Sequence, residues 1–236
     1  MVLEHARQIV AEADELEQTV RVKAHAGTTQ FRLGVSSTPG VMLTERLLCH
    51  AASQQPPMKI LVTGGPIALL ANALRERKFD ALLVDEWAVP LDMDLVIEPV
   101  AELQTALLCR PNHPLAKRKS IEFSEARQYP IACTGVSNEM ARLLVKSFGP
   151  DAHPSNMVTL TSEDIKCLLN TAMNTDAIFA GVLAPARDFL ARGDLVKLPL
   201  DTEGLGVCFS LIRLPGRTEP LAMSMLRDIV AQVLHD

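Results

Sequence analysis

The stretch FRLGVSSTPG, from Phe31 to Gly40, decides the fold predicted for this chain. Apolar and polar residues alternate up to Val35, a pattern that predicts a strand over 30–35. Small polar residues follow, and the spacing of apolar residues beyond them predicts a helix over 41–54. A helix start leaves backbone N–H groups free, so this loop either caps the helix or binds an anion. These residues alone leave both interpretations open.

The same alternation of strand, loop and helix continues along the chain. Strands at 58–63 and 79–84 flank a helix at 67–77, and their near-continuous apolar character favours a parallel sheet covered on both faces. Strands at 95–100 and 105–109 then follow each other without a helix between them. A second alternating set comprises strand 130–133, helix 138–148, strand 157–160, helix 163–174, strand 177–180, a short helix at 185–190 and strand 195–198.

We therefore predict an α/β fold of two similar lobes with one cleft between them. The first lobe comprises residues 30–98 and 208–236, because strand 207–213 and helix 220–234 have no partner in the second set; the second lobe comprises 99–207. Ligands of open α/β sheets bind beyond the carboxyl ends of the strands, where four loops carry small polar residues. These loops either hold a ligand or are ordinary helix caps. The candidate ligand-binding residues are Ser36, Ser37, Thr38, Thr63, Gly64, Thr134, Gly135, Thr161 and Ser162.

Residues 1–24 carry a different pattern, in which apolar residues recur at alternating spacings of four and three. This spacing predicts a linker helix with a narrow apolar seam. Such a helix packs either on its own domain or against another chain, and a narrow seam favours pairing between chains. The seam consists of Val2, Ala6, Ile9, Ala13, Leu16 and Val20.

Composition excludes several classes of function. The net charge of −5 is unfavourable for nucleic-acid binding by this chain itself, and 4% aromatic residues argue against a site lined with stacking rings. The five cysteines form no C-x-x-C pair, which predicts free thiols in a reducing cytosol. No signal-peptide pattern is visible, and no apolar run approaches the ~18 residues that span a bilayer.

Catalytic and cofactor motifs are absent from the sequence. It contains no phosphate-binding G-x-x-x-x-G-K-[ST], no dinucleotide-binding G-x-G-x-x-G and no H-E-x-x-H, and its six histidines are scattered. We expect no metal and no cofactor. Cys133 lies at a strand end near the predicted cleft, as either a reactive thiol or a buried structural cysteine; the burial typical of free cysteine favours the second.

Several segments resemble LysR-type transcriptional regulators. LEHARQIVAEADELEQ (3–18) is similar to the end of that family's linker helix, and TTQFRLGVSS (28–37) to its first regulatory strand and loop. LRERKFDALLV (74–84) resembles the family's L-x-x-G-x-L-D-x-A-L run, although Lys78 replaces a short hydrophobic residue. LLCRPNHPLAKRKSIEFSEA (107–126) matches best, around residues 113–116. Residues 180–185 resemble the G-x-G-I-A-x-L-P segment, with Thr175-Asp176 in place of its first glycine region.

The resemblance implies a two-lobed, periplasmic-binding-protein-like fold of type 2 with mixed sheets, and a small-molecule effector in the cleft. It also implies a homodimer or homotetramer that contacts DNA only through a winged helix-turn-helix preceding the linker helix. That module is absent here, which indicates a truncated regulator; a naturally short gene product stays open. We expect a cytoplasmic, non-enzymatic sensor of a carboxylate or other anion.

Two alternatives share the predicted fold. A solute-binding protein for transport is disfavoured by the missing signal peptide and by the predicted linker helix. A small-molecule enzyme would need a base or nucleophile in the cleft, and the loops offer only Glu163, Asp164 and Cys133.

Overall fold

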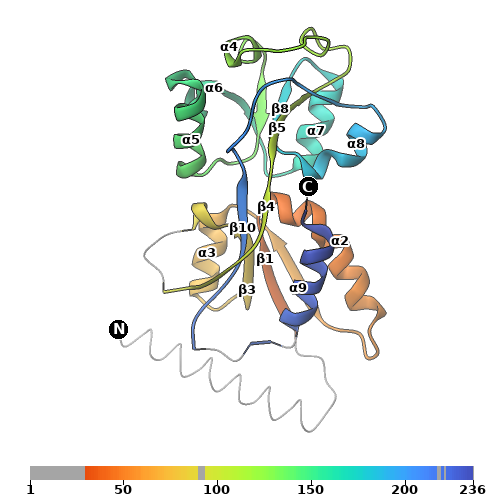
Figure 1. The fold of residues 1–236 in the computed structure, drawn as a ribbon. Coiled ribbons are helices and arrows are strands. Elements are labelled where there is room, and N and C mark those ends of the chain that lie inside the picture. Colours follow the sequence, from red (N-terminus) through yellow and green to blue (C-terminus); the bar gives the residue numbers. More distant parts are fainter. Residues whose placement is uncertain (1–29, 90–93, 217–218, 221, 236) are drawn as a thin grey trace.

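The structure is a computed structural model that describes residues 30–89, 94–216, 219–220 and 222–235. Two lobes, each built on a five-stranded sheet, stand one above the other (Figure 1). The predicted linker helix over 1–24 lies outside the described residues. Within the described ranges, no helix is long and apolar enough to cross a membrane. The two-lobed α/β prediction is confirmed.

The sheet of lobe I has the strand order β2-β1-β3-β10-β4. Strands β1 (Phe31–Val35), β2 (Ile60–Gly64) and β3 (Ala81–Asp85) are parallel, as their apolar runs predict. Strand β10 (Val207–Arg213) returns from the other lobe and pairs antiparallel with both β3 and β4 (Val96–Leu103). The expected return of the last strand is therefore observed.

In the part of the chain that the structure describes, three helices cover the lobe I sheet. Helices α2 (Ser37–Ser53) and α9 (Ala222–Val233) pack on one face, where fully buried leucines of both helices meet the side chains of β1. Helix α3 (Ile67–Arg75) packs on the other face. A short 3-10 helix, η1 (Glu86–Ala88), follows β3 in the segment between the strands predicted at 79–84 and 95–100.

Lobe II repeats this plan with the strand order β7-β6-β8-β5-β9. Its strands are β5 (Thr105–Cys109), β6 (Ile131–Cys133), β7 (Val158–Thr161), β8 (Ile178–Val182) and β9 (Val196–Lys197). Helices α4 (Phe123–Ala126), α5 (Asn138–Phe148) and α6 (Pro154–Met157) pack on one face. Helices α7 (Ile165–Asn174) and α8 (Arg187–Ala191) pack on the other. The short helices η2 (Pro150–Ala152) and η3 (Ala184–Ala186) complete the lobe; η2 and α6 were not predicted.

Helix α2 begins at Ser37, four residues before the predicted start at 41. The sequence pattern predicts Pro39 in a loop, but the structure has it in the first turn of α2. The backbone N–H groups of a first turn have no acceptor within the helix, so proline costs no hydrogen bond there, and its fixed φ suits a helix. The amide of Gly40 donates to the carbonyl of Ser36 at 2.9 Å, so the helical turn already closes there. The hydroxyl-rich segment is therefore the first turn of the helix.

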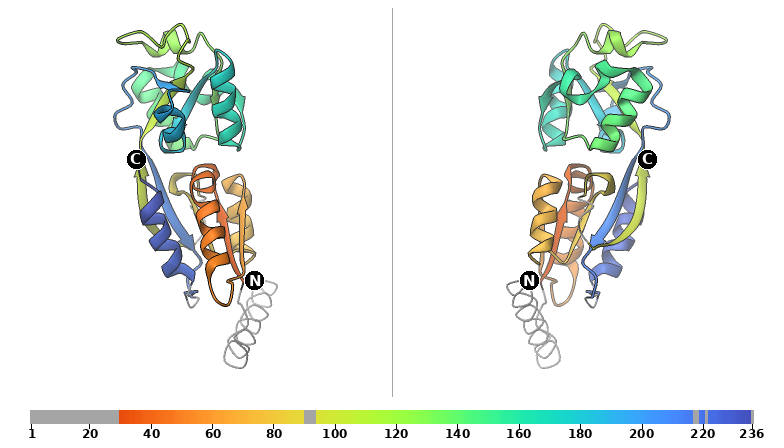
Figure 2. Two further views of the ribbon diagram at one scale, coloured as in Figure 1. Left: turned by 90° about the vertical axis from the view of Figure 1, so that its right-hand side faces the viewer. Right: turned by 90° about the vertical axis from the view of Figure 1, so that its left-hand side faces the viewer.

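The chain crosses between the lobes twice, and the side views show β4 and β10 joining them (Figure 2). Strand β4 remains in the lobe I sheet to Leu103, beyond the boundary at 98 expected from sequence. We accordingly take residues 104–206 as lobe II. The lobes also touch directly, because η1 packs on α5 and α2 packs on α7 and η3.

Candidate functional site

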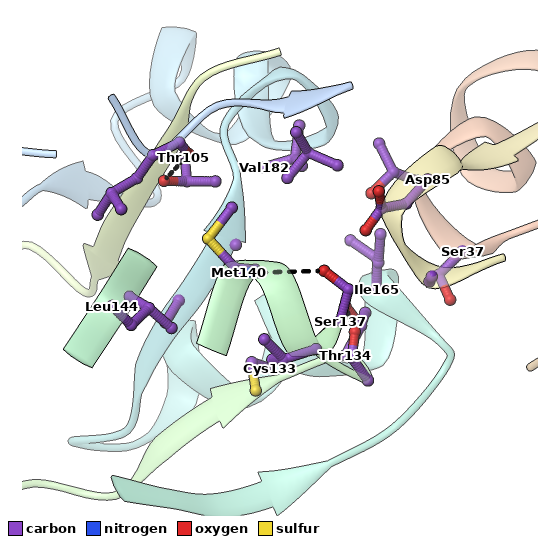
Figure 3. A pocket seen from close by; sticks show the side chains of 18 of the residues that line it. Ser37, Asp85, Thr105, Cys133, Thr134, Ser137, Met140, Leu144, Ile165 and Val182 are labelled. Atoms are coloured by element: carbon purple, nitrogen blue, oxygen red, sulfur yellow. Dashed lines mark hydrogen bonds between the residues drawn. The ribbon is translucent and has the colours of Figure 1, made fainter. Parts of the chain in front are cut away.

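A pocket of about 360 Å³ lies between the lobes and continues into lobe II. From lobe I it is lined by the first turns of α2 and α3 and by the end of β3. From lobe II it is lined by β5, β6, β8 and the apolar face of α5, as Figure 3 shows for Thr105, Cys133 and Met140. The cleft expected at the strand ends therefore exists, and it is deeper on the lobe II side.

Five of the nine candidate residues line this pocket: Ser36, Ser37, Thr38, Thr134 and Gly135. The other four, Thr63, Gly64, Thr161 and Ser162, are not among its lining residues.

The loops that contain those four residues do line the pocket, but with residues further along the chain, at 66–68 and at 163 and 165. Thr63 and Gly64 are still in β2, and the pocket is lined instead by Pro66, Ile67 and Ala68 at the start of α3. Thr161 ends β7. Ser162 accepts a hydrogen bond from the amide of Asp164 at 3.1 Å, within the turn that leads into α7.

The start of α2 presents unused hydrogen-bonding groups. Ser36 is the N-cap residue, yet its side chain makes no capping hydrogen bond. Its residue is 8% exposed, and its Oγ is a buried side-chain polar atom without a hydrogen-bond partner in the described structure. The amides of Ser37 and Thr38 have no acceptor inside the helix, because they lie in its first turn. A buried hydroxyl normally has a partner, so Ser36 is suited to bind a ligand.

Two carboxylates bridge the lobes, each at the helix start of the opposite lobe. Glu163 of lobe II accepts a hydrogen bond from the hydroxyl of Ser37 at the start of α2. Asp85 of lobe I lies near the hydroxyl of Ser137, the N-cap residue of α5, which acts to lower the pKa of this carboxyl. A negative charge is favoured at a helix N-terminus, where the helix dipole is positive. Each carboxylate therefore occupies a position that also suits an anionic ligand.

Burial raises the pKa of Asp85, more than the hydrogen bonds from Trp87 and Ser137 lower it, and the nearby charge of Glu86 adds to the increase. Within the described part of the chain, the pocket lining contains the carboxylates Asp85 and Glu163 but no lysine, arginine or histidine. Among the described residues, the groups of the lining that can attract an anion are therefore helix starts and hydroxyls rather than cationic side chains.

The deep part of the pocket is apolar. Side chains two residues apart in a strand share a face, and three neighbouring strands of lobe II present such pairs to the pocket. Helix α5 faces them with Met140, Leu144 and Phe148, spaced four residues apart. The strand pairs are Thr105 and Leu107, Ile131 and Cys133, and Ala180 and Val182.

The alternative of a reactive Cys133 is not supported by its surroundings. The residue is 3% exposed, and burial raises the pKa of its thiol to about 11. The thiolate is the nucleophilic form, so the side chain is an inert, neutral part of the wall near neutral pH. The described residues also contain no cluster of three or more His, Cys, Asp or Glu side chains able to hold a metal ion.

Sequence reasoning missed the roles of Asp85, Ser137 and the apolar face of α5. Asp85 is the N-cap residue of η1, where its carboxylate accepts from the amide of Trp87 at 3.0 Å. Its position at the carboxyl end of a strand was the signal that could have placed it in the site. The stripe on α5 carries no such signal, because apolar residues at helical spacing usually indicate core.

Comparisons with known proteins agree with this architecture. Residues 25–235 match the family model described as the LysR substrate binding domain. The SDS degradation transcriptional activation protein of Pseudomonas sp. (strain ATCC 19151) is 24% identical over 234 residues, which cover 98% of this chain and 75% of that protein.

Solved structures show the same fold. A full-length OxyR variant from Pseudomonas aeruginosa superposes with a TM-score of 0.69 and 16% identity, covering 98% of this chain and 83% of that one. The effector-binding domain of QuiR, in complex with shikimate, has a TM-score of 0.64 and 16% identity, covering 87% and 97%. The chain therefore belongs to the LysR substrate-binding-domain family, the effector-binding part of LysR-type transcriptional regulators.

Proposed function

We propose that this chain senses a small carboxylate or similar anion in the pocket between its lobes. The observation that carries the proposal is the buried Ser36 hydroxyl at the start of α2, which borders the pocket without a hydrogen-bond partner. A helix start with free amides and an unused hydroxyl is a favourable site for a carboxylate. QuiR, whose effector-binding domain is in complex with the carboxylic acid shikimate, supports the same ligand class.

Binding in this pocket can be coupled to a change in the angle between the lobes. The effector contacts groups of both lobes, and Glu163 already connects them through Ser37. An anion at the start of α2 replaces Glu163 and so alters the contact between the lobes. A ligand shifts the equilibrium between two arrangements of the lobes only if it binds one of them more tightly than the other. The affinities would differ here, because the ligand competes with Glu163 for Ser37 in one arrangement of the lobes.

In the regulator as a whole, we propose that this change repositions DNA-binding modules in a homodimer or homotetramer and so controls transcription in the cytoplasm. The role is one of binding and requires no catalysis. The relatives described above support it, since one of them is named an SDS degradation transcriptional activation protein.

A thermal-shift screen of organic acids tests the proposal, followed by titration of the acids that stabilise the protein. Ser36→Ala should weaken binding at least about tenfold, because a hydrogen bond to a charged group is lost. The ligand-free variant should unfold at the same temperature or slightly higher, because the hydroxyl has no partner to lose. If Ser36 were only a cap, the variant would instead lose about 1 kcal/mol of stability.

Ser53→Ala is the matched control, because it makes the same change at the other end of α2, where the hydroxyl donates to the carbonyl of His50. This variant should bind the acids as the parent does. The proposal fails if no acid stabilises the protein, or if the Ser36 and Ser53 variants bind every stabilising acid equally well.

A further inference from the structure

We propose that the effector is an amphiphile, with its anionic head at the start of α2 and an unbranched apolar tail running into lobe II beneath α5. The inference rests on the proposed function, because it names the class of molecule that the same pocket takes. Its basis is the deep part of the pocket. A small polar ligand bound at the start of α2 would leave this part empty.

The deep part lies where a packed core is expected. Leu107, Ile131 and Met157 line it, and all three also belong to the buried cluster on this face of the lobe II sheet. Protein interiors are close-packed, with few voids larger than a water molecule. An apolar space of this kind, open to the cleft, is typical of a binding site for an apolar group.

Helix α5 gives this space its shape. Met140 lies in the first turn of the helix, and Leu144 and Phe148 follow at one-turn intervals along the same face. Eight residues of α-helix span about 12 Å, so the apolar stripe is long and narrow. The ring of Phe148 stacks on that of Phe123, with 5.1 Å between ring centroids, and both rings line the pocket. Figure 3 shows Leu144 on the side of the pocket away from Ser37 and Asp85.

The polar groups in this part already have partners. The hydroxyl of Thr105 donates to the carbonyl of Leu205 at 2.8 Å, and that of Thr202 donates to the carbonyl of Thr105 at 2.8 Å. Cys133 adds only a buried, neutral thiol. A polar substituent on the ligand would lose its hydration here and find no free partner, which is costly. A hydrocarbon tail has no such cost.

The test is a calorimetric titration of the full chain with butanoate, hexanoate, octanoate and decanoate below their micelle concentrations. Each added methylene should tighten binding by up to about fourfold, as expected when a CH₂ group is fully buried. Leu144→Phe, which fills the space, should remove the advantage of octanoate over butanoate. Leu143→Phe is the matched control, because it changes the preceding residue of α5, which is not among the lining residues.

Leu144→Ala provides the opposite change and guards against a folding failure of the larger variant. It enlarges the space, so decanoate should bind this variant more tightly than octanoate does. If all four acids bind equally, or if the gain with length is the same in the parent and in Leu144→Phe, the tail inference is overturned. The proposed function still stands in that case, provided that butanoate binding depends on Ser36. If straight-chain alcohols show the gain and no carboxylate binds, the anionic head is wrong and both proposals fail.

Discussion

Glu163 is the charged side chain that contacts the start of α2, where we propose that an effector carboxylate binds. Its carboxylate holds the hydroxyl of Ser37, and it also lies close to Gly135, where an added Cβ would be 3.4 Å from its Oε1 atom. An effector carboxylate must displace this group or lie beside it. Two like charges about 4 Å apart near a protein surface repel by a few kcal/mol at most, and by about 1 kcal/mol where water screens them.

Glu163→Gln should therefore strengthen the binding of a carboxylate effector by about fivefold, corresponding to about 1 kcal/mol of relieved repulsion. The amide oxygen still accepts from Ser37, so the ligand-free contact between the lobes is retained. Titration of the same acid against the parent and the variant measures the effect. Glu139→Gln is the control, because this residue is on α5 outside the pocket lining and pairs with Arg142. Equal or weaker binding of the acid after Glu163→Gln would show that its carboxylate is not repelled by Glu163, which contradicts the prediction.

At the scale of elements, β1 depends on the absence of a side chain at Gly34. The residue pairs with Thr63 of β2 and Leu82 of β3 in the centre of the lobe I sheet. A Cβ built there would lie 2.5 Å from Cδ2 of Leu82 and 3.3 Å from Cδ2 of Leu70. Both leucines are buried in the cluster beneath α3, so neither can move aside freely.

Gly34→Ala should destabilise the protein by about 1–3 kcal/mol, the usual cost of overpacking a core. In a chain of this size that corresponds to a fall of about 2–4 °C in melting temperature for each kcal/mol. Chemical and thermal unfolding would measure it. Gly65→Ala is the control, because no atom lies within 4 Å of its built Cβ. Equal stability of the two variants would show that the packing around β1 can relax.

Sequence could predict most elements, because their signals are local. Strand β10 and helices α3 and α5 are at or close to the predicted residues, since apolar periodicity and flanking Gly or Pro residues define them. The start of α2 was placed too late because Ser36–Gly40 has the composition of a loop. Its conformation is helical because the first turn of a helix accepts Pro39 without losing a hydrogen bond.

At the scale of the whole molecule, part of the pocket could not be predicted from sequence, for a physical reason. Residues such as Leu144 and Met157 have the pattern of core residues, and only the packing of α5 against the sheet decides whether the space between them is filled. The contacts of Glu163 with Ser37 and of Asp85 with Ser137 join segments of different lobes. Local periodicity carries no information about such pairs, whereas the loops at the strand ends followed from topology.

The contact of Asp85 with Ser137 links the arrangement of the lobes to pH. Burial raises the pKa of Asp85 above its ordinary value of 3.8, and the charge of Glu86 beside it adds to the increase. The native protein therefore keeps this proton to a higher pH than the unfolded chain does. Between the two pKa values the native state binds more protons, so stability falls as the pH rises through that range. Acidification therefore stabilises the native state, in which Asp85 lies near Ser137 of the other lobe.

Asp85→Asn removes this ionisation and should flatten the dependence of stability on pH. The melting temperature of the parent should rise relative to that of the variant as the pH falls from about 7 towards 4, because only the parent regains a neutral Asp85. Trp87, the single tryptophan of the chain, lies two residues away and reports unfolding through its fluorescence. Asp188→Asn, at an exposed carboxylate on α8, should track the parent at every pH. If Asp85→Asn tracks the parent as well, the ionisation of Asp85 does not affect the stability of the protein, and the predicted effect of its burial is wrong.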